Sequence, residues 1–112
     1  MKLPGGDKAI IGREKIVDYL LNPAHPDNGG KAGFFVDLGF NPTDWQVMAM
    51  ALRRIAENDP ITKTVASAHG TKYIIESRIG SLRGKAPLVR TVWIIDKGLD
   101  LPRLVTAYPR DE

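Results

Sequence analysis

The chain has 112 residues, of which 43% are hydrophobic and 26% are charged, with a net charge of +3 and no cysteine. This length and composition are typical of a globular protein, and we expect a single domain over residues 1–112. The lack of cysteine excludes a disulfide scaffold, a zinc ribbon and a thiol nucleophile. No apolar run is as long as a membrane span, and residues 1–8 lack the apolar stretch of a signal peptide, so we expect a cytoplasmic protein with no membrane partner.

Three helices are predicted in the first half of the chain. The first covers residues 13–21, where apolar side chains recur at helical spacing, and Pro23 ends it. The second covers residues 31–38. The third covers residues 42–58, because Asn41 is placed to cap a helix whose apolar residues lie on one face.

The pattern changes after Pro60, where β-branched and aromatic residues become frequent. Four strands are predicted, at residues 61–67, 72–79, 88–96 and 103–108. Their connections are too short for crossover helices, so neighbouring strands should pair antiparallel. The predicted fold is therefore α+β, with three N-terminal helices packed on a four-stranded antiparallel β-meander.

The core is predicted from the apolar stripes of the helices and from one face of the third strand. Seven side chains are expected to be mostly buried: Leu20, Phe35, Trp45, Leu52, Ile55, Trp93 and Ile95.

Positive charge gathers in the strand-rich half. Residues 63–90 contain six basic residues and one acidic residue, so they carry a net charge of +5 and the remainder of the chain carries −2. A basic patch attracts a polyanion such as RNA, although solvated strand and loop residues explain the same pattern. Lys31 adds a cation after a glycine pair at a predicted helix start, which resembles an anion site but equally fits a turn before a helix.

Both histidines of the chain stand in predicted loops, His25 between two prolines and His69 beside Gly70, which lets the backbone approach a ligand closely. The ordinary pKa of histidine lies near neutrality, which suits a general base and a general acid in RNA cleavage. The alternative is that each histidine is a solvent-exposed or hydrogen-bonding loop residue. With no cysteine and scattered carboxylates, the chain is expected to hold neither a metal ion nor a cofactor.

Cations and hydroxyl groups on the predicted strands are the other candidates. Lys72 lies three residues beyond His69, Arg90 begins the third strand, and Thr106 and Tyr108 share one face of the last strand. If the faces of Arg90 and Thr106 coincide, they form a phosphate-binding surface with Tyr108. Strand propensity explains the same residues without any ligand. Antiparallel pairing also argues against a close approach of Arg90 to His69.

Several segments resemble an uncharacterised bacterial domain family. They include Leu-Leu-Asn-Pro-Ala-His-Pro at residues 20–26, His-Gly-Thr-Lys-Tyr at residues 69–73 and Pro-Arg-Leu-Val-Thr-Ala-Tyr-Pro at residues 102–109. The resemblance covers nearly the whole chain. That family is a domain of unknown function that occurs as small stand-alone proteins and near the C-terminus of secreted bacterial polymorphic toxins. The resemblance therefore implies secretion if the chain is a toxin domain.

A weaker resemblance, in architecture only, links the chain to the barnase–EndoU–colicin–RelE group of ribonucleases. It implies a metal-independent ribonuclease of toxin type that binds RNA. A histidine would take the 2′-hydroxyl proton, basic side chains would stabilise the pentavalent phosphate, and hydroxyl groups would position it. The side chains that would carry this chemistry are His25, His69, Lys72, Arg90, Thr106 and Tyr108.

The alternative function is a non-catalytic protein-binding module. Such an immunity-like or adaptor protein would bind a partner protein through the sheet or through a helix face. Convergence of a histidine, Lys72 and Arg90 in one cleft favours the ribonuclease, and their dispersal around a flat or apolar patch favours the binding module.

Overall fold

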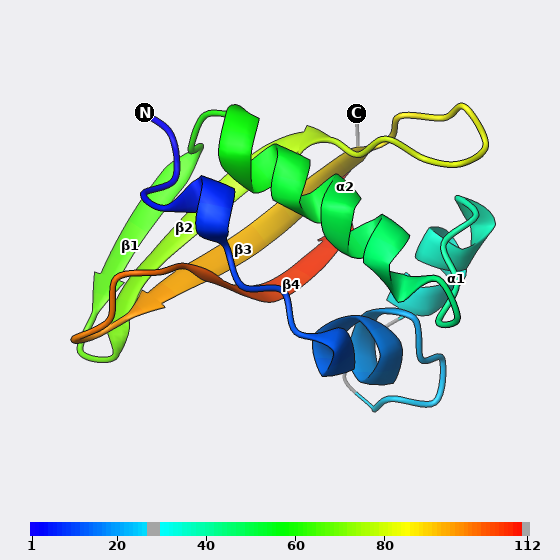
Figure 1. The fold of residues 1–112 in the computed structure, drawn as a ribbon, viewed down its shortest axis with the longest axis horizontal. Coiled ribbons are helices and arrows are strands. Elements are labelled where there is room, and N and C mark those ends of the chain that lie inside the picture. Colours follow the sequence, from blue (N-terminus) through cyan, green and yellow to red (C-terminus); the bar gives the residue numbers. More distant parts are fainter. Residues whose placement is uncertain (27–29, 111–112) are drawn as a thin grey trace.

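The computed structural model describes residues 1–26 and 30–110 and has an antiparallel sheet as its centre (Figure 1). The loop predicted before the second helix therefore lies partly outside the described residues. The strands are β1 (Lys63–Ser67), β2 (Gly70–Arg78), β3 (Leu88–Asp96) and β4 (Arg103–Pro109). Each strand pairs with the next in the order β1-β2-β3-β4. The α+β class and the four-stranded antiparallel sheet are thus confirmed.

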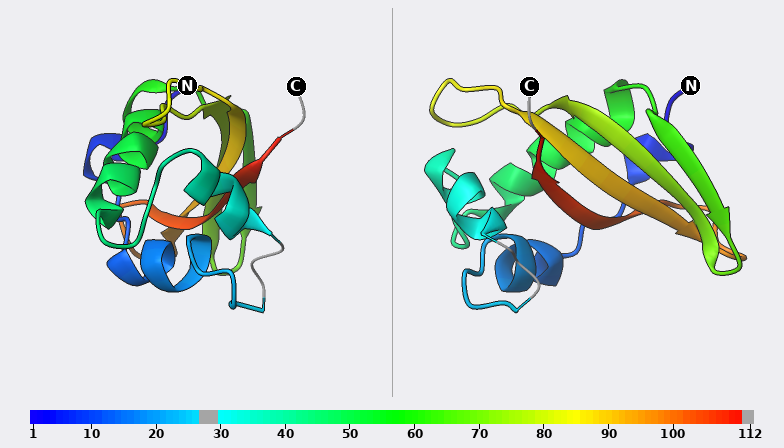
Figure 2. Two further views of the ribbon diagram at one scale, coloured as in Figure 1. Left: turned by 90° about the vertical axis from the view of Figure 1, so that its right-hand side faces the viewer. Right: turned by 180° about the vertical axis from the view of Figure 1, so that it is seen from behind.

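The helical elements come before the strands in the chain. They are a 3-10 turn η1 (Gly6–Lys8), a π-helix η2 (Lys15–Leu20), and the α-helices α1 (Lys31–Asp37) and α2 (Trp45–Asn58). Helix α2 crosses one face of the sheet, while η2 and α1 lie beside one end, close to β4 (Figure 1). Seen from behind, the opposite face of the sheet carries no helix among the described residues (Figure 2).

The first predicted helix is wound as a π-helix. Its backbone includes a hydrogen bond from the Leu21 nitrogen to the Ile16 oxygen, 2.8 Å long and spanning five residues. Apolar spacing alone does not separate this winding from an α-helix in so short a segment. The wider turn puts Ile16, Leu20 and Leu21 into the core. The intervening Tyr19 remains half-buried.

Helix α2 begins at Trp45, so the predicted start at residue 42 is wrong by three residues. Asn41 uses its side chain differently from the expected cap. Its Oδ1 atom accepts a hydrogen bond of 2.9 Å from the backbone nitrogen of Asp44, which closes a turn before the helix. Asparagine competes with helical geometry in this way because its short amide reaches nearby backbone groups.

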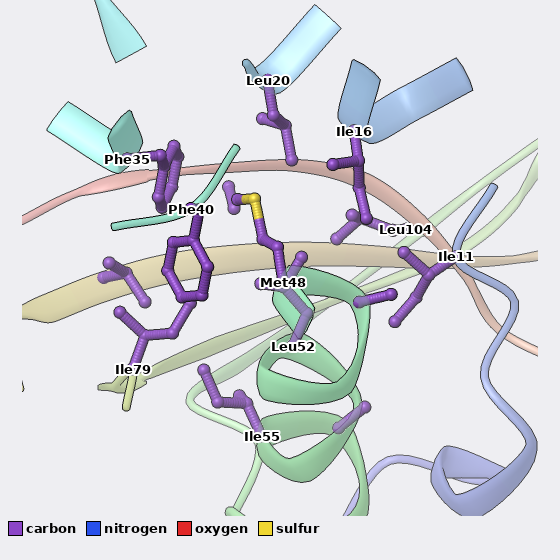
Figure 3. Packing of buried hydrophobic residues seen from close by; sticks show 14 of the residues in the cluster. Ile11, Ile16, Leu20, Phe35, Phe40, Met48, Leu52, Ile55, Ile79 and Leu104 are labelled. Atoms are coloured by element: carbon purple, nitrogen blue, oxygen red, sulfur yellow. The ribbon is translucent and has the colours of Figure 1, made fainter. Parts of the chain in front are cut away.

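The predicted core is largely correct. Leu20, Phe35, Leu52, Ile55 and Trp93 are buried, and Figure 3 shows side chains of η2, α1 and α2 converging over the sheet. The other two predicted residues are half-buried because each lies at an end of its element. These are Trp45, the first residue of α2, and Ile95, near the end of β3.

A β-bulge in β4 sets which side chains face the core. Val92 pairs with Thr106, but Trp93 pairs with Leu104, so Val105 is the extra residue. Leu104 and Ala107 are three positions apart, and simple alternation would place them on opposite faces of the sheet. The bulge lets both reach the core.

Candidate functional site

Six half-buried polar side chains gather where η2 and α1 meet β4. We call them the β4-edge cluster. Its members are Tyr19, His25, Lys31, Arg90, Thr106 and Tyr108. They come from η2, the loop after it, the start of α1 and two strands, so the tertiary fold rather than local sequence assembles them.

Lys31 is at the centre of this cluster. Its Nζ atom donates hydrogen bonds to the Tyr19 hydroxyl and, over 3.2 Å, to Thr106 Oγ1. The two hydroxyl oxygens are themselves 3.0 Å apart. The Lys31 Nζ atom also lies 5.7 Å from the centroid of the Tyr108 ring. One ammonium group therefore connects residues of η2 and β4.

The surroundings of Tyr19 change its acidity. Partial burial alone raises the pKa of the phenol, but hydrogen bonds from Lys31 and Thr106 and the charges of Lys31 and Lys15 outweigh it. The pKa of Tyr19 is therefore lowered from its ordinary value. A hydroxyl group with a lowered pKa is a better proton donor than a free tyrosine.

Arg90 occupies the middle of a row of cross-strand partners, with Glu76 on β2 and Tyr108 on β4. Its NH2 atom is 2.7 Å from Glu76 Oε1, and its NH1 atom donates to the Tyr108 hydroxyl over 3.2 Å. The Arg90 hydrogen bond lowers the pKa of Glu76, and the charge of nearby Arg110 adds to this effect. The carboxylate thus stays ionised and holds the guanidinium in place.

His25 joins the cluster through an aromatic contact. Its ring centroid is 5.0 Å from that of Tyr19, with the planes at 72°. The loop that carries it is closed by a backbone hydrogen bond of 3.2 Å from the His25 nitrogen to the Asn22 oxygen. This contact places an imidazole ring beside the hydrogen-bonded phenol of Tyr19.

The structure does not bring His69 or Lys72 to this cluster. His69 precedes Gly70, which pairs with Asp96 at the far end of β3. At a rise of about 3.3 Å per residue, Asp96 lies about 20 Å along the strand from Arg90. Lys72 pairs with Ile94, about 13 Å along the same strand from Arg90. His69 and Lys72 are both exposed, so the predicted convergence of a histidine, Lys72 and Arg90 in one cleft is not found.

Gly70 has a structural explanation in this turn. A Cβ atom there would lie 2.4 Å from the Ile95 backbone oxygen and 2.9 Å from the Asp96 Cα atom. Its φ of +146° is also one that other residues rarely adopt. The expectation that Gly70 leaves room for a ligand is therefore wrong, because the neighbouring strand fills the space.

Tyr19 is a functional candidate that the sequence pattern did not predict, and the signal at Lys31 was weak. The one available signal for Tyr19 is its position between the buried Ile16 and Leu20, because a hydroxyl group in an apolar stripe needs a hydrogen-bond partner. Glu76 was visible as the lone acid of a basic segment. Its pairing with Arg90 depends on strand register, which the sequence does not specify.

Over residues 1–26 and 30–110, no three His, Asp or Glu side chains are grouped to hold a metal ion. No helix in the described part of the chain is long and apolar enough to cross a membrane.

A family model for a domain of unknown function (DUF6883) matches residues 2–111. The chain belongs to this family. The predicted resemblance to an uncharacterised domain family is thereby confirmed. No curated protein matches the chain.

The fold is similar to that of a chain in a contact-dependent growth inhibition toxin–immunity protein complex from Klebsiella pneumoniae 342. The TM-score is 0.73 and the sequences are 22% identical, over 90% of this chain and 99% of the other. At this identity the similarity shows a shared fold.

Proposed function

We propose that this DUF6883 domain is a metal-independent ribonuclease of toxin type whose active site is the β4-edge cluster. The observation that carries the proposal is the contact of Lys31 with two hydroxyl groups, those of Tyr19 and Thr106. The likeness to a chain of a toxin–immunity complex supports the toxin context.

The cations of the cluster bind the scissile phosphate. Lys31 and Arg90 lie 5.7 Å and 5.8 Å from the centroid of the Tyr108 ring, so both cations are beside the same side chain. An ammonium and a guanidinium group stabilise the charge that builds up on a pentavalent phosphate. The hydroxyl groups of Thr106 and Tyr108 orient the phosphate oxygens.

Proton transfer uses His25 and Tyr19. His25 accepts the proton of the 2′-hydroxyl group, and the 2′-oxygen forms a bond to phosphorus as the bond from phosphorus to the 5′-oxygen breaks. Tyr19 donates its proton to that leaving 5′-oxygen, and Lys31 stabilises the resulting phenolate. Proton exchange with water then restores both groups and leaves a 2′,3′-cyclic phosphate product.

The test is cleavage of purified tRNA and mixed RNA in the presence of EDTA, with detection of 2′,3′-cyclic phosphate ends. We expect Lys31→Ala to lower the rate at least 100-fold, as the loss of a transition-state donor does. The matched control is Lys72→Ala, which removes an exposed lysine on β2, away from the β4-edge cluster. No cleavage by the native protein, or equal loss in the two variants, would overturn the proposal.

The second candidate function is an immunity-like binding module. A hollow of about 590 Å³ between α2 and the β2–β3 loop favours it, because Met50 and Leu82 in its wall are 58% and 60% exposed. Expression in a bacterial host discriminates the two functions. A toxin stops growth, and Lys31→Ala relieves the arrest, whereas a binding module leaves growth unchanged.

A further inference from the structure

A second, basic hollow lies beside the β4-edge cluster. It has a volume of about 340 Å³ and is formed where α1, the β2–β3 loop and the end of β4 come together. Its wall includes the cations of Arg78, Lys85 and Arg110 and the ring of Phe34, and no acid is among the lining residues that the structure describes. Such a hollow favours an anionic ligand that also has an aromatic or apolar part.

The cations of this hollow are held by the fold. Arg78 NH1 donates a hydrogen bond of 2.9 Å to the Ala86 oxygen, which fixes the β2–β3 loop against β2. Arg110 Nε lies 3.4 Å from Glu76 Oε2. Lys85 is exposed at the rim. The positive charge is therefore presented on a defined surface rather than on a mobile tail.

Glu76 connects the hollow to the β4-edge cluster. Its Oε2 atom contacts Arg110 and its Oε1 atom contacts Arg90, at 3.4 Å and 2.7 Å. The two guanidinium groups that share this carboxylate are therefore neighbours, so a strand with one phosphate at Lys31 and Arg90 has the hollow within reach of its next nucleotide. Two phosphates of one strand are the simplest ligand for two neighbouring basic surfaces.

Phe34 supplies the aromatic part of the hollow. It is half-buried, and its ring stands edge-on to Phe35 with centroids 5.1 Å apart. Packing against Phe35 fixes the ring, so it loses little freedom when a base stacks on it. Aromatic rings beside cations are the usual means of binding a single strand without base pairing.

Resting on the proposed function, we propose that this hollow binds the phosphate and base of a nucleotide flanking the cleaved bond. The substrate class is then single-stranded RNA of several nucleotides rather than a dinucleotide or a folded duplex, because a paired base would not be available for stacking on Phe34.

The kinetic test compares a dinucleoside monophosphate with a single-stranded oligoribonucleotide. The native protein should cleave the oligonucleotide with a kcat/KM at least tenfold higher, in line with the usual contribution of a stacked base. Phe34→Leu combined with Lys85→Ala should raise KM for the oligonucleotide about tenfold and leave kcat and the dinucleotide rate unchanged. The charge-matched control is Arg83→Ala, in the same loop but not among the residues that line the hollow. Equal efficiency on both substrates, or equal effects of the variants and the control, would overturn the inference.

A binding measurement separates this inference from the proposed function. Fluorescence anisotropy with an oligodeoxynucleotide, which has no 2′-hydroxyl group and is not cleaved, measures binding without catalysis, and the Lys85 variant isolates the contribution of the hollow. Lys85→Ala should reduce the slope of log K against log salt by about 0.7, and Arg83→Ala should not. Binding that depends on Lys85 in a protein that cleaves no RNA would overturn the ribonuclease and retain the hollow. Cleavage of RNA by a protein whose binding does not depend on Lys85 would overturn the proposed role of the hollow and retain the ribonuclease.

Discussion

The two ends of the sheet hold different kinds of histidine. At the β4 edge, His25 is half-buried against Tyr19, whose hydroxyl group contacts Lys31 and Thr106. At the β1–β2 turn, the exposed His69 is fixed through its backbone, which bonds to Ser67 Oγ and to the Lys97 nitrogen. The first environment lowers the pKa of the Tyr19 hydroxyl group. The two histidines thus differ in burial and in the side chains around them, although both are loop residues beside turn formers.

The largest difference between the two ends should appear in catalysis. Tyr19→Phe removes the proposed general acid and keeps the ring, so RNA cleavage should fall about 100- to 10,000-fold. His69→Gln removes the exposed histidine and should change the rate less than about twofold. Single-turnover rates with labelled RNA measure both. A larger loss in His69→Gln than in Tyr19→Phe would move the active site to the β1–β2 turn.

The second difference concerns stability. Phe35 lies on α1, which contacts β4, and is fully buried. Phe35→Ala should therefore lower the free energy of unfolding by about 3–5 kcal/mol. Ile95 is half-buried towards the other end, and Ile95→Ala should cost about 1–2 kcal/mol. Urea denaturation followed by tryptophan fluorescence gives both values. Equal losses would show that the two ends are packed equally well.

The third difference is a titration. Lys31→Met removes a hydrogen bond and a positive charge that lower the pKa of Tyr19, so that pKa should rise towards its ordinary value. The ultraviolet absorbance of tyrosinate as a function of pH reports it, with Tyr19→Phe identifying the contribution of that residue. Lys72→Met is the control at the other end and should leave the curve unchanged. If Lys31→Met left the tyrosinate titration curve unaltered, Lys31 would not be the cause of the lowered pKa of Tyr19.

The smallest expected effect is the pH dependence of stability that comes from ion pairs. Both ends of the sheet should show it, because each end has one ion pair. Arg90 lowers the pKa of Glu76, and Arg103 lowers that of Asp96. The ordinary pKa is 4.5 for Glu76 and 3.8 for Asp96, and each is lower in the folded protein. Each carboxylate therefore stabilises the fold at a pH above its ordinary pKa. This stabilisation is lost as the pH falls through the lowered pKa of the folded state. Glu76→Gln and Asp96→Asn should each lower the thermal midpoint slightly at neutral pH and flatten its decline in acid. Identical acid profiles in native and variant proteins would contradict both assignments.

The sequence was sufficient for the strands and for most of the core, because alternating and helical apolar spacing acts locally. The sequence left open whether Arg90, Thr106 and Tyr108 meet, because this depends on strand register. In the structure Arg90 pairs with Tyr108 and donates a hydrogen bond to its hydroxyl group. The rest depended on distant contacts. Tyr19 and Thr106 are 87 positions apart in the chain, and no local pattern indicates that their hydroxyl groups meet.

His69 shows the opposite difficulty. Its place beside Gly70 suggested an opening for a ligand, whereas the neighbouring β3 backbone accounts for the glycine. Turn residues satisfy backbone geometry first, and the sequence alone does not separate that requirement from a binding role.

The extra residue Val105 has a consequence for how relatives of this chain should be compared. It shifts the alternation of β4 once, so Leu104 and Ala107 point one way while Thr106 and Tyr108 point the other. A family member that lacks this one residue would differ by a single gap in an alignment, yet the residues after the gap would exchange interior and exterior positions. An insertion or deletion at this position in evolution is therefore equivalent to replacing several side chains at once. Two sequences that match well on either side of it can present different chemistry to the solvent.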